Sequence, residues 1–174
     1  MKRKLLVSSA FLILVPLGAA QAQVRGTATG SLEVLLRVTE ACEVNGSASG
    51  GTGRATLDFG ETQLLTASVD GEIGTGGSGG IEVRCNPGVD YTVEFGPGEN
   101  ATEVSARAMA GPTGSTNVPY QLYSDAARSV VLTQVSDTGN GAFQSIPIYG
   151  RVPAISPAPA AGSYRDVVTV TVSF

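Results

Sequence analysis

Regular interruption by glycine and proline is what most restricts the fold of this chain. The 174 residues include 23 Gly and 9 Pro, and after residue 22 they leave no window long enough for an amphipathic helix. Between them lie short runs in which apolar and polar residues alternate, a pattern typical of half-buried β-strands. The sequence therefore predicts an all-β chain, arranged as an antiparallel sandwich or barrel.

The two clearest alternating runs lie near the two ends of the chain. Residues 31–39 place one set of apolar side chains on one parity and polar side chains on the other, with Leu35 as the exception. The apolar set consists of Leu32, Val34, Leu36 and Val38. In residues 164–174 the apolar set is Val168, Val170, Val172 and Phe174.

Other strands are expected between these runs. Residues 55–59, 118–122 and 130–135 are predicted to be short strands. Residues 81–95 are predicted to form a hairpin that turns at residues 86–88. Residues 143–152 contain Pro147, which cannot donate to a central ladder, so we expect an edge strand or a bulge there.

The first 22 residues have the pattern of a secretory signal peptide. Lys2, Arg3 and Lys4 precede an apolar run over residues 5–17, and Ala20-Gln21-Ala22 fits a cleavage site. The run is shorter than the ~20 apolar residues of a spanning helix. We therefore expect a secreted chain that begins at Gln23, with residues 39–174 as its single domain.

The two cysteines, Cys42 and Cys85, both follow the leader and would reach an oxidising compartment. We predict a disulfide between them, which leaves no thiol for catalysis or for metal binding.

The expected mature chain is poor in groups that catalyse reactions or bind anions. It has no His and no Lys after Lys4, and its 15 acidic residues outnumber its Arg. Nucleophile–base pairs and transition-metal sites lack members, and phosphate-bearing partners lack a basic patch. Asp137-Thr138-Gly139 matches an aspartic-protease core, but that chemistry needs two facing carboxylates, and the triplet occurs once in a polar turn. We predict no enzyme, no cofactor, no metal, no small-molecule substrate and no nucleic-acid partner.

The pairing of residues 32–38 is the question that periodicity leaves open. The run can be the first strand of its own sandwich, or it can add a strand to a neighbouring subunit. Burying four such side chains at ~1.5–3 kcal/mol each would contribute roughly 6–12 kcal/mol, enough for a tight joint between subunits.

Several spaced elements, in order along the mature chain, resemble one family. They are residues 29–34 with Arg37 and Val38, Leu57-Asp58-Phe59-Gly60, residues 81–85, residues 120–128, residues 147–150 and residues 162–166 leading into Val168. Through these elements the chain resembles the archaic (Csu-type) chaperone–usher pilins, which share the spore coat protein U domain.

The resemblance implies an incomplete immunoglobulin-like antiparallel β-sandwich that is completed by a donor strand. Residues 23–38 would be the donor segment, with Leu32, Val34, Leu36 and Val38 as its plugs. Val168, Val170, Val172 and Phe174 would form one wall of the acceptor groove, and Cys42–Cys85 would brace the domain.

The function implied is that of a structural pilus subunit. It would pass through the periplasm with a chaperone, exchange strands at an outer-membrane usher and join copies of itself in an extracellular adhesive fibre, with an adhesin as a further partner. Two alternatives remain: a tip adhesin, which would be scarce in the fibre, and a secreted coat protein that folds residues 32–38 into its own sandwich and stays monomeric.

Overall fold

The computed structural model describes residues 26–45, 53–74 and 80–174, so the predicted leader lies outside the described residues. By its contacts the chain divides into two units, Met1–Arg37 and Val38–Phe174, each of which is described by itself. The elements found in the described part are β1 (Cys42–Val44), β2 (Val69–Ile73), β3 (Ile81–Cys85), β4 (Asp90–Phe95), the 3₁₀ helix η1 (Val104–Ala106), β5 (Ala108–Met109), β6 (Val118–Pro119), β7 (Gln121–Tyr123), β8 (Gln134–Thr138), β9 (Gln144–Ile146), β10 (Ile148–Val152) and β11 (Val170–Ser173).

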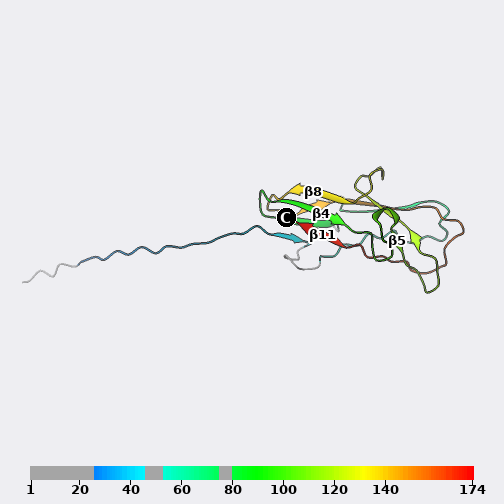
Figure 1. The fold of residues 1–174 in the computed structure, drawn as a ribbon, viewed down its shortest axis with the longest axis horizontal. Helices are drawn as coiled ribbons and strands as arrows, with labels where there is room; N and C mark the ends of the chain where they lie inside the picture. The colour runs from blue at the N-terminus through cyan, green and yellow to red at the C-terminus, as the bar shows by residue number, and fades with distance from the viewer. Residues whose placement is uncertain (1–25, 46–52, 75–79) are drawn as a thin grey trace, which may run out of the picture. The chain divides into compact units, whose positions relative to one another are not determined.

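The strands form antiparallel sheets. Their orders are β1-β3-β9, β2-β10-β7 and β11-β4-β8, with β5 and β6 as a separate pair. Figure 1 shows β8, β4 and β11 side by side in the third of these sheets. The predicted all-β class is confirmed, because the described residues carry no α-helix. Within that same part of the chain, no helix has the length and hydropathy needed to cross a bilayer.

One apolar cluster is shared by all three larger sheets. Val83 and Val93 are fully buried in β3 and β4, and Ile148 and Val152 are buried in β10. In these strands buried residues alternate with more exposed ones, as the sequence pattern predicts. The sheets therefore pack around a common core, as the layers of a sandwich do.

The predicted hairpin over residues 81–95 is wrong in its pairing. The strand β3 pairs with β1 and β9, whereas β4 pairs with β11 and β8. The turn is present, with Val89 N donating to Asn86 O at 3.2 Å and Gly88 at a φ of 83°. It carries the chain from one sheet to another. Alternation reports which face of a strand is buried and says nothing about its partner, so the sequence pattern could not distinguish the two cases.

At Pro147 the chain likewise passes from one sheet to another. It separates β9, which is an edge strand, from β10, which lies between β2 and β7. Of the edge strand or bulge expected over residues 143–152, the edge position is thus correct for the part before Pro147, whereas the part after it lies inside a sheet. The missing N–H of Pro147 falls between the two ladders, where no donor is needed.

Four other expected strands differ from the observed ones. The strand expected over residues 118–122 is observed as two, β6 and β7, separated at Tyr120. Residues 55–59 are assigned to no strand, and the strand expected over residues 130–135 is β8, which runs from Gln134 to Thr138. Near the end of the chain the ladder begins only at Val170.

The Asp137-Thr138-Gly139 triplet has a structural role. The Asp137 carboxylate accepts hydrogen bonds from the Thr138 amide at 2.8 Å and from Gln144 Nε2 at 2.9 Å. Gly139 lies against the backbone beside the disulfide, where a Cβ would be 2.5 Å from Asn86 O and 2.7 Å from Cys85 Cβ. The lack of room for a side chain therefore explains why position 139 is a glycine.

We expect Gly139→Ala to destabilise the domain by ~1–3 kcal/mol, because a methyl group would overlap backbone atoms that cannot move aside freely. Urea unfolding followed by circular dichroism measures the change. Gly26→Ala is the matched control, since no heavy atom lies within 4 Å of a Cβ at that position. Equal midpoints for the two variants would contradict the prediction.

Candidate functional site

The apolar side chains of residues 32–38 are exposed. Each is between 73 and 88% accessible, and no strand is assigned in residues 26–41. Leu35, on the other parity, is as exposed as its neighbours at 81%. This set, Leu32, Val34, Leu36 and Val38, is called the donor row below. Its role as a donor stays a prediction.

The second predicted row lies on and beside the edge strand β11, with Val170 and Val172 in the strand. Val168, Val170 and Val172 are half-buried and alternate with exposed Thr169 and Thr171. Phe174 lies beyond the strand and is 51% exposed. These four apolar residues are called the acceptor row.

One edge of β11 pairs with β4, and its other edge has no ladder partner among the described residues. A half-buried apolar row beside an open edge is the geometry to which an added strand binds. On that side the main chain of β11 has no ladder partner within the described part of the chain, and Val170 and Val172 are only partly covered by the core.

A third row was not predicted as part of the site. Ala55, Leu57 and Phe59 are half-buried and alternate with exposed residues, although no strand is assigned there. Leu57 and Phe59 pack where Gly71 and Gly150 face each other across β2 and β10. At Gly150 a Cβ would be 2.5 Å from Leu57 Cδ2 and 2.7 Å from Phe59 Cζ. The alternation in residues 55–59 was a signal for this half-buried row, but its packing on Gly71 and Gly150 was not visible from the sequence.

A carboxylate lies just before β11 and links it to the Phe59 row. Asp166 Oδ2 accepts a 2.7 Å hydrogen bond from Tyr120 Oη, and Oδ1 accepts one from Asn100 Nδ2 at 2.7 Å and one from the Glu99 amide at 3.0 Å. The Tyr120 ring meets Phe59 edge-on, with 6.4 Å between centroids. Burial, and then the hydrogen bond to Asp166, raises the pKa of Tyr120. Tyr120 therefore stays a neutral donor at physiological pH.

Arg107 is fully buried and binds neutral oxygens. Its guanidinium donates to Gly96 O from Nε at 3.0 Å and from Nη2 at 2.9 Å, and to Gln121 Oε1 from Nη1 at 2.7 Å. Further bonds run to the carbonyl oxygens of Phe95 and Leu132. Burial lowers the pKa of Arg107 from its ordinary value, but a guanidinium remains protonated in proteins.

Cys42 and Cys85 form the predicted disulfide. They are also register partners in the β1–β3 ladder. The Asn86 amide donates to Ala41 O at 3.1 Å, directly before Cys42. Ala41 and Cys42 are therefore held to the end of β3 both by a main-chain hydrogen bond and covalently.

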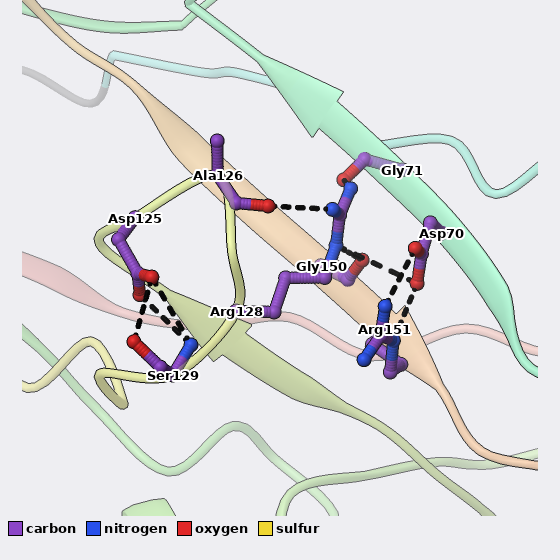
Figure 2. Close-up of polar contacts among 8 residues, drawn as sticks. All are labelled: Asp70, Gly71, Asp125, Ala126, Arg128, Ser129, Gly150 and Arg151. Atoms are coloured by element: carbon purple, nitrogen blue, oxygen red, sulfur yellow. Dashed lines mark hydrogen bonds and ion pairs between the residues drawn. The ribbon is translucent and has the colours of Figure 1, made fainter.

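Residues 120–128 contain a turn held by one carboxylate. Asp125 Oδ1 accepts hydrogen bonds from the amides of Ser129 at 3.0 Å and Val130 at 2.8 Å, and Ser129 Oγ donates to Oδ2 at 2.8 Å. Figure 2 shows Asp125 with Ser129 on one side of this turn and Arg128 on the other. The amide bonds, that of Val130 first, lower the pKa of Asp125.

Arg128 extends from the turn across β10 and β2. It donates to Gly150 O at 3.1 Å and to Gly71 O at 3.4 Å, and it forms a 3.5 Å ion pair with Asp70 (Figure 2). Its φ of 57° is left-handed, which is uncommon for a residue other than glycine. Arg128 thus reinforces the same glycine pair on which Leu57 and Phe59 pack.

A polar hollow of about 420 Å³ lies over β4 and β8. Its side chains bind one another: Thr138 Oγ1 donates to Asp90 Oδ1 at 2.6 Å, and the hydroxyls of Thr92 and Ser136 are 2.9 Å apart. Among the described residues, no group of three or more His, Cys, Asp or Glu is placed to hold a metal ion. Most of the polar groups that line the hollow therefore already have partners.

The sequence matches the Spore Coat Protein U domain over residues 28–171. The chain belongs to this family. The resemblance predicted from the spaced sequence elements is thereby confirmed at the level of the family. No match was found among curated proteins.

A solved structure shares the fold of this spore coat U chain. It is the crystal structure of the CsuC–CsuE chaperone–tip adhesion subunit pre-assembly complex from archaic chaperone-usher Csu pili of Acinetobacter baumannii, matched at 20% identity with a TM-score of 0.50. The match covers 79% of this chain and 40% of that chain. The likeness is consistent with the predicted immunoglobulin-like antiparallel sandwich.

We expect replacement of both cysteines by Ser to destabilise the domain by ~4 kcal/mol, the chain-entropy value for a loop of 43 residues. The urea midpoint of the double variant, compared with that of the oxidised wild-type chain, measures this change. A change below ~1 kcal/mol would show that the disulfide does not brace the fold.

Acid should weaken the turn at Asp125. Because its pKa is lower in the folded chain than the ordinary value of 3.8, the carboxylate stabilises the fold above that value. This stabilisation is lost as the pH falls from about 4 through the lower, folded pKa. Urea unfolding between pH 6 and pH 2 should show a smaller decline for Asp125→Asn than for the wild type, and parallel declines would contradict the assignment.

Proposed function

We propose that this spore coat U chain is a structural pilus subunit that polymerises by donor-strand exchange. The donor row of one subunit would bind along the open edge of β11 in the next, and its apolar side chains would cover the acceptor row. The observation that carries the proposal is the half-buried valine row of β11 beside an edge that lacks a ladder partner in the described structure.

The donor segment has the chemistry that such an edge requires. Its four apolar side chains are exposed, and burying them would contribute roughly 6–12 kcal/mol before association costs are subtracted. An added strand also supplies main-chain hydrogen bonds to an edge that has no ladder partner in the described structure. Both terms favour a long-lived joint between subunits.

Assembly would follow the route of the family that the chain resembles. An exposed apolar edge promotes aggregation, so a periplasmic chaperone would cover it until the subunit reaches an outer-membrane usher. The CsuC–CsuE structure is described as a chaperone–subunit pre-assembly complex, which supports this step by analogy. The product would be an extracellular fibre made of copies of this chain.

Leu36→Asp tests the donor role. A carboxylate buried in an apolar groove costs about 3 kcal/mol or more, which corresponds to a capture weakened roughly a hundredfold or further. We expect the variant to fold and to bind chaperone but to give no SDS-resistant ladder that collapses to monomer on boiling.

Ser31→Asp is the matched control, because it adds the same charge to the polar parity of the same segment and should leave the ladder intact. Normal ladders from Leu36→Asp would overturn the proposal. A wild-type chain that elutes as a stable monomer without chaperone would instead indicate a self-completed coat protein.

A further inference from the structure

The strand β11 carries a pattern that does not fix its own register. Residues 167–173 read Val-Val-Thr-Val-Thr-Val-Ser, in which Val and Thr repeat with a period of two. A slip of one residue would turn the valines to solvent, but a slip of two replaces Val by Val and Thr by Thr on the same faces. The sequence of the strand therefore accepts at least two alignments with β4.

The ladder itself supplies little discrimination. Its pairs run from Val170↔Phe95 to Ser173↔Thr92, and main-chain hydrogen bonds form with any residue. The same holds for the isolated bridge between Ala110 and Arg165, which consists of two main-chain bonds. Because main-chain bonds form in either alignment, the alignment of β11 with β4 has to be selected by a contact that one particular side chain makes.

Asp166 makes such a contact four residues before β11. Its three hydrogen bonds come from two separate segments of the chain: the Tyr120 hydroxyl on one, and the Asn100 side-chain amide and the Glu99 main-chain N–H on the other. A slip of two residues would bring Val168 or Tyr164 to this position. Neither side chain carries a carboxylate, so three donors would lose their acceptor, at a cost for each one that is buried away from water.

The loop over residues 96–100 is shaped around this carboxylate. Gly98 has a φ of 96°, and a Cβ there would collide with the Asp166 carboxylate. In the same loop Gly96 N donates to Thr169 O at 2.9 Å, immediately before the ladder begins. The loop thus receives one side chain at one position of the chain that enters β11.

We propose that Asp166 is a positioning residue that sets the register of β11 against β4. It fixes which valine stands at each point of the acceptor row. Without it, β11 would also populate an alignment shifted by two residues, which displaces the row by about 7 Å along the sheet. The register itself is inferred from the contacts of Asp166. Only the consequence, that the donor row meets its sites in one alignment, rests on the proposed function.

Engineered cross-strand cysteines report the register directly. Directly opposed residues in an antiparallel pair have Cα atoms within the range that a disulfide spans. Glu94 and Thr171 are opposed and exposed. Glu94→Cys with Thr171→Cys therefore reports the observed register, whereas Glu94→Cys with Thr169→Cys or with Ser173→Cys reports the two slipped ones.

In the full exported chain we expect only the 94–171 pair to close. Adding Asp166→Asn should raise closure of a slipped pair roughly tenfold, which corresponds to the loss of about one charge-assisted hydrogen bond. Tyr120→Phe keeps the ring, removes one donor and should shift closure in the same direction, so it serves if Asp166→Asn does not fold. Asp70→Asn is the control, because it removes a carboxylate that pairs with Arg151 on another sheet.

The inference would be overturned if only the 94–171 pair closed in both Asp166→Asn and Tyr120→Phe. It would also be overturned if a slipped pair closed in Asp70→Asn to the same extent as in Asp166→Asn. The cross-link forms within one subunit and is read whether or not fibres assemble. An absence of SDS-resistant ladders from the wild-type chain would therefore overturn the proposed function while leaving the register result to stand separately.

Discussion

Arg107 places a positive charge where solvent does not reach, and the oxygens that surround it are neutral. Its fork binds the carbonyl groups at the end of β4, and one of these, Gly96 O, belongs to the residue whose N–H binds Thr169 O. A lysine could not replace this planar set of donors. Arg107 thus joins the end of β4 to Leu132, and Gly96, which it binds, is joined in turn to the residue before β11.

A second constraint comes from two facing glycines, which have no side chain. Gly71 and Gly150 face each other across β2 and β10, and the space that they leave is filled by Leu57 and Phe59. Arg128 binds the carbonyl groups of the same two glycines. The Phe59 ring then meets Tyr120, whose hydroxyl reaches Asp166. Packing on the sheet of β2 and β10 is thereby connected with the strand β11 of another sheet.

The sequence was sufficient to predict the all-β class, the disulfide, and the half-buried face of β11. These follow from period-two alternation and from the presence of two cysteines alone, which are local or compositional signals. The partners of the strands were not predictable, since β3 and β4 have the pattern of a hairpin and yet lie in different sheets. Arg107 was missed for a similar reason: a single arginine between an alanine and a methionine-containing strand gives no sign that distant carbonyl groups converge on it.

The position of the disulfide has a mechanical consequence. In a fibre of the proposed kind, tension on the bound donor segment of a subunit would pass through Ala41 into the domain and reach Cys42 first. The strand β1 that follows is only 3 residues long, and its ladder would peel under load. The disulfide would instead transfer the force to Cys85 at the end of the buried strand β3, so the load would bypass β1 and reach the core directly.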